Sequence, residues 1–126
     1  MAAAGLILAD TSIWIDHLRG EDTGLQALLA AEGICCHPFI VGEVALGSLK
    51  NSAATLDQLK LLPMVPAAHT SEVAAFVEWA KLFGTGIDYV DAHLLTSVRL
   101  SEGTRLWTRD KRLRAQAERL GVAFTP

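Results

Sequence analysis

The chain contains few residues of the kinds that mark exported, disulfide-stabilised or membrane-spanning proteins. Its 126 residues include two cysteines, Cys35 and Cys36, which are adjacent. Because neighbouring strand residues point to opposite faces and a vicinal disulfide is strained, we expect both to be reduced core thiols. The apolar N-terminal stretch lacks a basic segment and is interrupted by Asp10, and no uncharged apolar run approaches the roughly 20 residues that span a bilayer. We therefore expect a cytoplasmic protein with no membrane partner.

Several common site motifs are also missing. The sequence has no Gly-x-Ser-x-Gly nucleophile elbow, no Walker A loop and no Gly-x-Gly-x-x-Gly dinucleotide motif. Its histidines and cysteines lack the Cys-x₂-Cys and His-x₃-His spacings of zinc sites. Its three tryptophans are not interleaved with basic residues, as they would be in a platform that stacks single-stranded bases. These absences argue against nucleophilic triads, nucleotide-binding loops and structural zinc.

Charge is distributed unevenly along the chain. Residues 1–98 carry four basic and eleven acidic side chains, whereas residues 99–126 carry seven basic and three acidic ones. This asymmetry indicates either two functional poles or a last helix with a solvated basic face.

The order of apolar segments predicts the fold class. Short strand-like runs occur at 6–9, 34–36, 105–108 and 122–124. Helical spacing occurs at 13–18, 25–31, 39–49, 53–62, 71–83, 88–100 and 110–120. Strands that alternate with more numerous helices predict a single α/β domain over residues 1–126, a three-layer α/β/α fold with a short, mainly parallel central sheet flanked by helices. In such sheets ligands bind at the carboxyl ends of the strands.

Four carboxylates stand in positions that need an explanation. Asp10 ends the first strand, and Asp110 lies where the 105–108 strand leads into the last helix, although both are also good helix N-caps. Glu43 and Asp91 each fall among the apolar residues of a predicted helix, where an unpaired carboxylate is unfavourable. Asp88, one turn before Asp91, is either a further ligand or a simple helix start.

If the four carboxylates converge, they need a counter-charge. Four like charges repel strongly unless a cation lies between them. Oxygen ligands without organised histidine or cysteine partners select a hard ion, Mg²⁺ or Mn²⁺. Metal sites of this kind commonly serve phosphoryl chemistry on phosphodiesters.

Four segments in this order resemble PIN-domain proteins, in particular the VapC toxin ribonucleases of type II toxin–antitoxin systems. The segments are LADTSIWIDHLRG, IVGEVALGSL, GIDYVDAHLL and LWTRDKRL. The resemblance implies a PIN-like fold and a metal-dependent endoribonuclease whose catalytic and metal-binding acids are Asp10, Glu43, Asp91 and Asp110. It also implies that Thr11, Ser12 and Thr108 are supporting hydroxyls, while Asp88 matches no fixed catalytic position.

Together these observations predict a mechanism. Asp10 and Asp91 hold Mg²⁺ (or Mn²⁺) most directly, Glu43 and Asp110 complete the site, and an activated water attacks the RNA phosphorus in line. Basic residues of the C-terminal region are expected to bind the RNA backbone: Arg99, Arg105, Arg109, Lys111, Arg112 and Arg114.

The resemblance further implies a homodimer and a cognate VapB-type antitoxin that places an Arg-containing segment in the acidic pocket. Trp14, Leu18 and the helix at 71–83 are either partner contacts or core. Three alternatives stay open: a catalytically silent PIN-like scaffold that binds RNA or protein, a DNA nuclease of the same fold, and a phosphoacceptor receiver domain. The receiver pattern fits poorly, because Asp57 lies inside a predicted helix instead of at a strand end.

Overall fold

A short parallel sheet forms the centre of the molecule. The structure, a computed structural model, describes residues 5–21, 24–47 and 52–126. Its strands β1 (Ile7–Ala9), β2 (Ile34–Cys35) and β3 (Arg105–Trp107) are all parallel and lie in the order β2-β1-β3. Parallel bridges between Cys36 and Met64 and between Leu106 and Ala123 widen the sheet at both edges. The predicted strand at 122–124 is therefore a single bridge, because pairing there is limited to Ala123.

Helices surround this sheet in the order that the periodicity predicts. They are α1 (Thr11–Leu18), α2 (Leu25–Ala30), α3 (Pro38–Leu46), α4 (Ser52–Leu61), α5 (Thr70–Trp79), α6 (Tyr89–Leu100) and α7 (Lys111–Arg119). Helix α5 ends four residues before the predicted Phe83, since Lys81 adopts a positive φ of 55° that breaks the helix. Residues 48 and 49, predicted as the end of the third helix, lie outside the described residues.

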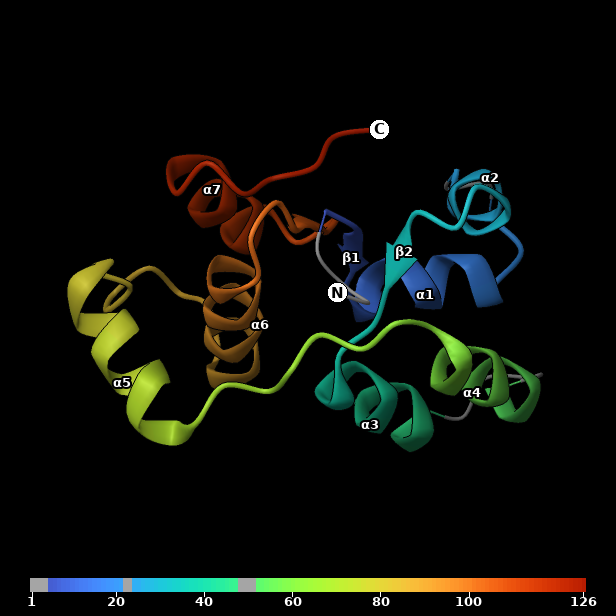
Figure 1. Cartoon of the computed structure of the whole chain (residues 1–126), viewed down its shortest axis with the longest axis horizontal. Coiled ribbons are helices and arrows are strands. Elements are labelled where there is room, and N and C mark those ends of the chain that lie inside the picture. The colour runs from blue at the N-terminus through green and yellow to red at the C-terminus, as the bar shows by residue number, and fades with distance from the viewer. Residues whose placement is uncertain (1–4, 22–23, 48–51) are drawn as a thin grey trace.

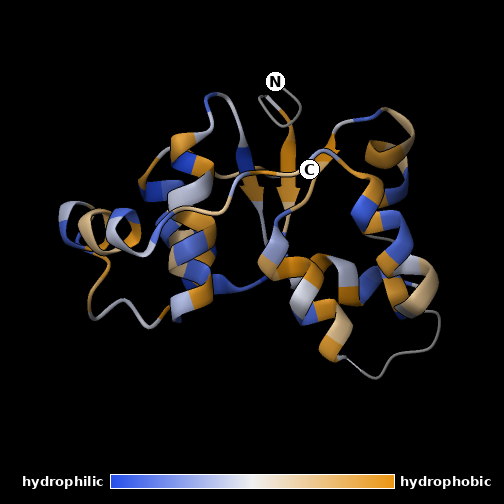
Figure 2. Cartoon of the chain, turned by 60° about the horizontal axis from the view of Figure 1, so that its bottom comes forward, coloured by the Kyte–Doolittle hydropathy of each residue, from blue (hydrophilic) through white to orange (hydrophobic). Residues whose placement is uncertain are grey.

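The sheet lies between two groups of helices. Figure 1 shows α5, α6 and α7 on one side of the strands and α1 to α4 on the other. Helix α6 packs against β3, and α1 packs against β1. The strands themselves are strongly hydrophobic, as Figure 2 shows, and Leu8, Ala9 and Leu106 are almost completely buried. This arrangement confirms the predicted three-layer α/β fold.

Helix α6 is buried around its whole circumference over most of its length. All residues from 92 to 98 are buried. More than one face of the helix is therefore covered, because α6 packs against both β3 and α5. Two of its buried polar side chains are hydrogen-bonded: the Thr96 hydroxyl donates to the carbonyl of Ala92 at 2.7 Å, and the Ser97 hydroxyl lies 3.0 Å from Nε2 of His37. The third, His93, has no hydrogen-bond partner for its buried Nδ1 among the described residues. Asp91 stands at the start of this buried stretch and is half-buried.

Helix α3 is more exposed than predicted. Ile40 and Val44 are buried, but Glu43 is exposed and Leu46 is 90% exposed. The prediction that Glu43 lies on a buried stripe is wrong, because only the Ile40–Val44 side of the helix faces the core.

Other predicted core features are confirmed. Cys35 and Cys36 are buried and unbridged, and burial raises the pKa of their thiols to about 12 and about 11. Trp14 is completely buried, which assigns it to the core and not to a partner contact. Among the described residues no helix has the length and apolar character needed to cross a bilayer.

Candidate active site

Three helices begin at the carboxyl end of the sheet, and each begins with an aspartate. The side chain of Asp10 caps α1, that of Asp88 caps α6 and that of Asp110 caps α7. Asp110 Oδ1 accepts from the N–H of Leu113 at 2.9 Å. The partial positive charge of each helix N-terminus favours a carboxylate there. Capping thus accounts locally for the placement of these residues and directs their carboxylates to one edge of the sheet.

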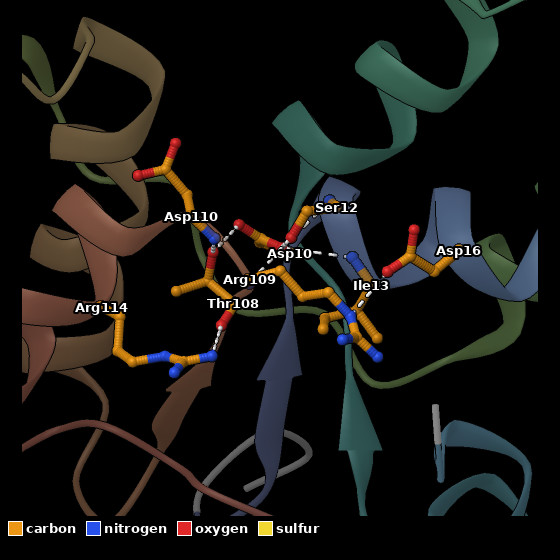
Figure 3. A network of polar contacts seen from close by, with 8 residues as sticks. All are labelled: Asp10, Ser12, Ile13, Asp16, Thr108, Arg109, Asp110 and Arg114. Atoms are coloured by element: carbon orange, nitrogen blue, oxygen red, sulfur yellow. Dashed lines mark hydrogen bonds and ion pairs between the residues drawn. The ribbon is translucent and has the colours of Figure 1, made fainter. Parts of the chain in front are cut away.

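Asp10 is the most buried of the acids and is held by a set of hydrogen bonds. It is 6% exposed. Its Oδ1 accepts from the Ser12 hydroxyl, from the Ser12 N–H at 3.0 Å and from the Ile13 N–H at 3.4 Å. Its Oδ2 accepts from the Thr108 hydroxyl. Figure 3 shows these donors arranged around the carboxylate. Among the described residues Thr108 is the one donor to Oδ2, so this oxygen keeps accepting capacity for a further ligand.

Burial and hydrogen bonding act on Asp10 in opposite directions. Desolvation raises the pKa of Asp10, while the hydrogen bonds from Ser12, Thr108 and Ile13 lower it in part. The net effect is a pKa above the ordinary value of 3.8. The two hydroxyls therefore supply the main compensation for a carboxylate placed beneath the site surface.

Asp91 is linked electrostatically to the other aspartates. Burial, together with the negative charges of Asp88, Asp110 and Asp10, raises the pKa of Asp91 to about 7, against a lowering by its hydrogen bond with Asp88. The backbone N–H of Asp91 donates to Asp88 Oδ1 at 2.8 Å, and the N–H of Asp88 donates to Asp91 Oδ2 at 3.4 Å. This reciprocal cap gives the Asp88 side chain a structural role at the start of the helix. Its role as a further ligand stays a prediction, since Asp10 and Asp110 also cap helices. The charges of Asp88, Asp110 and Asp10 thus all act on Asp91.

Glu43 reaches the site from α3 through a hydroxyl. Thr11 Oγ1 donates to Glu43 Oε1 at 2.6 Å, and Thr11 follows Asp10 directly in the chain. Glu43 is exposed, and the charges that raise the pKa of Asp91 are those of Asp88, Asp110 and Asp10, so Glu43 lies at the rim of the acidic group. The predicted hydroxyl residues Thr11, Ser12 and Thr108 all bond to predicted acids.

Comparison with known proteins supplies a second line of observation. Residues 7–119 match the family model of the PIN domain. The chain belongs to the PIN-domain family. Ribonuclease VapC32 of Mycobacterium tuberculosis (strain CDC 1551 / Oshkosh) is 48% identical to it over 119 residues, which cover 94% of this chain and 96% of that protein. The protein of the same name from strain ATCC 25618 / H37Rv matches equally well. The resemblance to VapC-type PIN domains is confirmed.

A solved structure shares the fold of this PIN domain. The crystal structure of PAE2754 from Pyrobaculum aerophilum matches it with a TM-score of 0.65 at 18% sequence identity, covering 98% of this chain and 91% of the other. At that identity the likeness shows the fold alone.

The donor set of this PIN domain suits a hard divalent ion, although its side chains are not gathered around one point. Among the described residues no three side chains of His, Cys, Asp or Glu stand where they could hold one metal ion together. The acids nevertheless offer only oxygen ligands, and the charges of Asp88, Asp110 and Asp10 add to burial in raising the pKa of Asp91. Oxygen donors around an excess of negative charge fit Mg²⁺ or Mn²⁺.

The predicted RNA-binding residues fall into two groups. Arg109, Lys111, Arg112 and Arg114 lie in the β3–α7 turn and the first turns of α7, beside the acids. Arg114 Nη2 donates to the carbonyl of Thr108 at 3.2 Å. The other two lie elsewhere: Arg105 begins β3, with its guanidinium over the ring of Phe124, and Arg99 ends α6, over the ring of Trp79. Four of the six predicted RNA-binding residues therefore lie near the acids.

Sequence reasoning did not single out Asp16. Its Oδ2 lies 2.6 Å from Nε of Arg109, in an ion pair that joins α1 to the β3–α7 turn. Asp16 stands six residues after Asp10 in the opening segment, and no local pattern distinguishes it from an ordinary solvated helix residue. Because residues 16 and 109 are far apart in the sequence, their contact cannot be predicted without the fold.

Proposed function

We propose that this chain is the toxin component of a VapBC-type module, an endoribonuclease that depends on Mg²⁺ or Mn²⁺ and hydrolyses RNA phosphodiester bonds. The observation that carries the proposal is the gathering of Asp10, Asp91 and Asp110 at the carboxyl edge of the sheet, where burial and the charges of Asp88, Asp110 and Asp10 raise the pKa of Asp91. The 48% identity to proteins named Ribonuclease VapC32 supports RNA as the substrate.

Asp10 and Asp91 are the proposed principal ligands, with Glu43 and Asp110 completing the set. Asp10 is preorganised, because four hydrogen bonds from three residues fix its carboxylate and leave Oδ2 able to accept more. Asp91 must give up its proton before it can act as a ligand, since its pKa is about 7. When bound, a divalent ion supplies Lewis acidity and the counter-charge that phosphodiester hydrolysis requires.

Basic side chains beside the acids are proposed to hold the RNA backbone. Lys111 and Arg112 are exposed on the first turn of α7, immediately after the capping Asp110. The Arg112 side chain crosses Gly86, where an added Cβ would lie 2.9 Å from its Cδ. That packing sets the guanidinium close to the segment that leads into the N-terminus of α6. Phosphate contacts of this kind would make RNA binding weaken with salt.

Two partners follow from the proposed function, a VapB-type antitoxin and a second copy of the chain. A guanidinium from the antitoxin would serve the acids as a counter-charge in place of a metal ion. Large apolar side chains are exposed on α3, α4, α5 and α6, and they offer surfaces for such partners: Leu46, Leu61, Trp79 and Leu100.

The direct test compares RNA and DNA oligonucleotides of the same sequence. We expect wild-type protein with Mg²⁺ to cut the RNA, to spare the DNA, and to lose activity in EDTA. Asp10→Asn and Asp91→Asn are expected to abolish cleavage, whereas Asp57→Asn, an exposed carboxamide substitution on α4, retains it. RNA that binds but stays intact would instead identify a silent scaffold, and cleavage of DNA alone would identify a DNA nuclease.

A further inference from the structure

The β3–α7 turn supports both oxygens of Asp10 in the same way. The N–H of Asp110 donates to Thr108 Oγ1 at 3.0 Å, and the Thr108 hydroxyl donates to Asp10 Oδ2. The N–H of Arg109 donates to Ser12 Oγ at 3.1 Å, and the Ser12 hydroxyl donates to Asp10 Oδ1. In each of these two hydrogen-bond chains, the hydroxyl oxygen accepts a hydrogen bond from a backbone N–H. The hydroxyl proton is therefore directed toward the Asp10 carboxylate.

Each of the two hydrogen-bond chains crosses once from the β3–α7 turn to the start of α1. In the first, the crossing bond joins the Thr108 hydroxyl to Asp10, 98 residues away in sequence. In the second, it joins the Arg109 N–H to Ser12 of α1, 97 residues away. The ion pair between Arg109 Nε and Asp16 Oδ2 joins the same two elements beside this second bond. Figure 3 shows the Arg109 side chain reaching from the turn to Asp16 on α1.

We propose that the Asp16–Arg109 ion pair is a positioning element for the Asp10 carboxylate. It holds the turn against α1, so that the Arg109 N–H stays on the Ser12 hydroxyl and that hydroxyl stays on Asp10. Neither side chain needs to touch the metal ion or the RNA for this role. The inference rests on the proposed function, because it assigns the pair a purpose in preparing the same site.

The exposure of the pair distinguishes positioning from general stabilisation. The side chains of Arg109 and Asp16 are 49% and 18% exposed. Ion pairs that remain partly in water contribute little to global stability. Loss of the pair should therefore leave the urea unfolding midpoint at its wild-type value while it changes the geometry around Asp10.

Four variants test the proposal: Asp16→Asn, Arg109→Gln, the double variant, and Arg109→Lys, which keeps a cation for Asp16. In the first three we expect an affinity for Mn²⁺, measured by electron paramagnetic resonance, about tenfold lower than wild type. We also expect kcat on RNA to fall about tenfold with KM unchanged. The backbone amide of residue 109 should exchange its hydrogen faster than in the wild-type protein. The double variant should be no worse than either single one, because both break the same contact. Arg109→Lys should recover part of each loss.

Matched controls are Glu118→Gln on α7 and Arg19→Gln at the end of α1, both exposed positions that are expected to leave all three readouts unchanged. If Arg109→Gln raises KM alone and Asp16→Asn changes nothing, Arg109 grips the RNA and the proposal is wrong. A lowered unfolding midpoint that accounts for the lost activity also overturns it. Should the wild-type protein fail to cut RNA, the proposed function fails, while Mn²⁺ affinity and amide exchange still decide the role of the pair.

Discussion

Replacing Asp91 by asparagine should stabilise the metal-free protein while it removes activity. Asparagine keeps the size of the side chain and an oxygen that can accept from the Asp88 N–H, so the reciprocal cap at the start of α6 can remain. What the substitution removes is a negative charge that burial and three neighbouring aspartates disfavour. Residues placed for function at the expense of stability commonly behave in this way.

The sign and size of the effect follow from linkage. The pKa of Asp91 is about 7 in the folded protein and close to 3.8 when the chain is unfolded. Wild-type stability is therefore undiminished below about pH 4, decreases as the pH rises toward 7, and is constant above it. The full difference corresponds to about 4 kcal/mol. Because the side chain is only half-buried, solvent screening reduces this to about 1–2 kcal/mol.

Urea denaturation in EDTA between pH 4 and pH 9 measures the effect. We expect Asp91→Asn to unfold with the same free energy as wild type near pH 4 and to be more stable by about 1–2 kcal/mol at pH 8. Asp57→Asn serves as the control and should show no such pH-dependent gain. A destabilised Asp91→Asn protein at pH 8, or a difference that is constant across the range, would refute the view that the acids repel one another.

Three further predictions concern the surroundings of Asp91. Thr108→Val removes the donor to Asp10 Oδ2 and the acceptor of the Asp110 N–H, so we expect the RNA cleavage rate to fall about tenfold or more. Single-turnover cleavage at saturating RNA measures this rate. An unchanged rate would show that the hydroxyl is dispensable. Gly86 has a φ of 85° and lies against the Arg112 side chain. Gly86→Ala should therefore lower the free energy of unfolding in urea by roughly 1 kcal/mol or more and weaken RNA binding in filter assays. Unchanged stability and unchanged binding would show that Arg112 moves aside freely. Mg²⁺ at one hundred times its Kd should raise the free energy of unfolding by about 2.7 kcal/mol, with the gain reversed by EDTA and absent in Asp10→Asn.

The order of elements could be predicted because local signals agreed with the global fold. Asp10, Asp88 and Asp110 stand where a capping residue is needed, and the strands that precede α1 and α7 are short apolar runs. Agreement between capping, periodicity and strand pattern is typical of sequences that specify one fold. Even so, the last strand was over-predicted, since the apolar run at 122–124 carries no information about which backbone groups find a partner.

The burial of the acids could be predicted only in part. A helical wheel assumes that one face of a helix meets the core, but α6 is covered on several sides and α3 projects its last turn outward. Asp91 is therefore at the edge of the buried stretch 92–98 of α6, and Glu43 is exposed, although both had the same predicted environment. Contacts that depend on tertiary packing, such as those of Thr108 with Asp10 and of Arg109 with Asp16, have no local signature.

Asp10 and Asp91 together are proposed to hold the divalent ion at which RNA is hydrolysed. The most direct test is an anomalous difference map from crystals of the wild-type protein soaked in Mn²⁺ above pH 7, where Asp91 is ionised. We expect a peak within ligand distance of Asp10 Oδ2 and of the Asp91 carboxylate, and its loss in Asp91→Asn. A peak bound elsewhere, or one that persists without the Asp91 carboxylate, would contradict it.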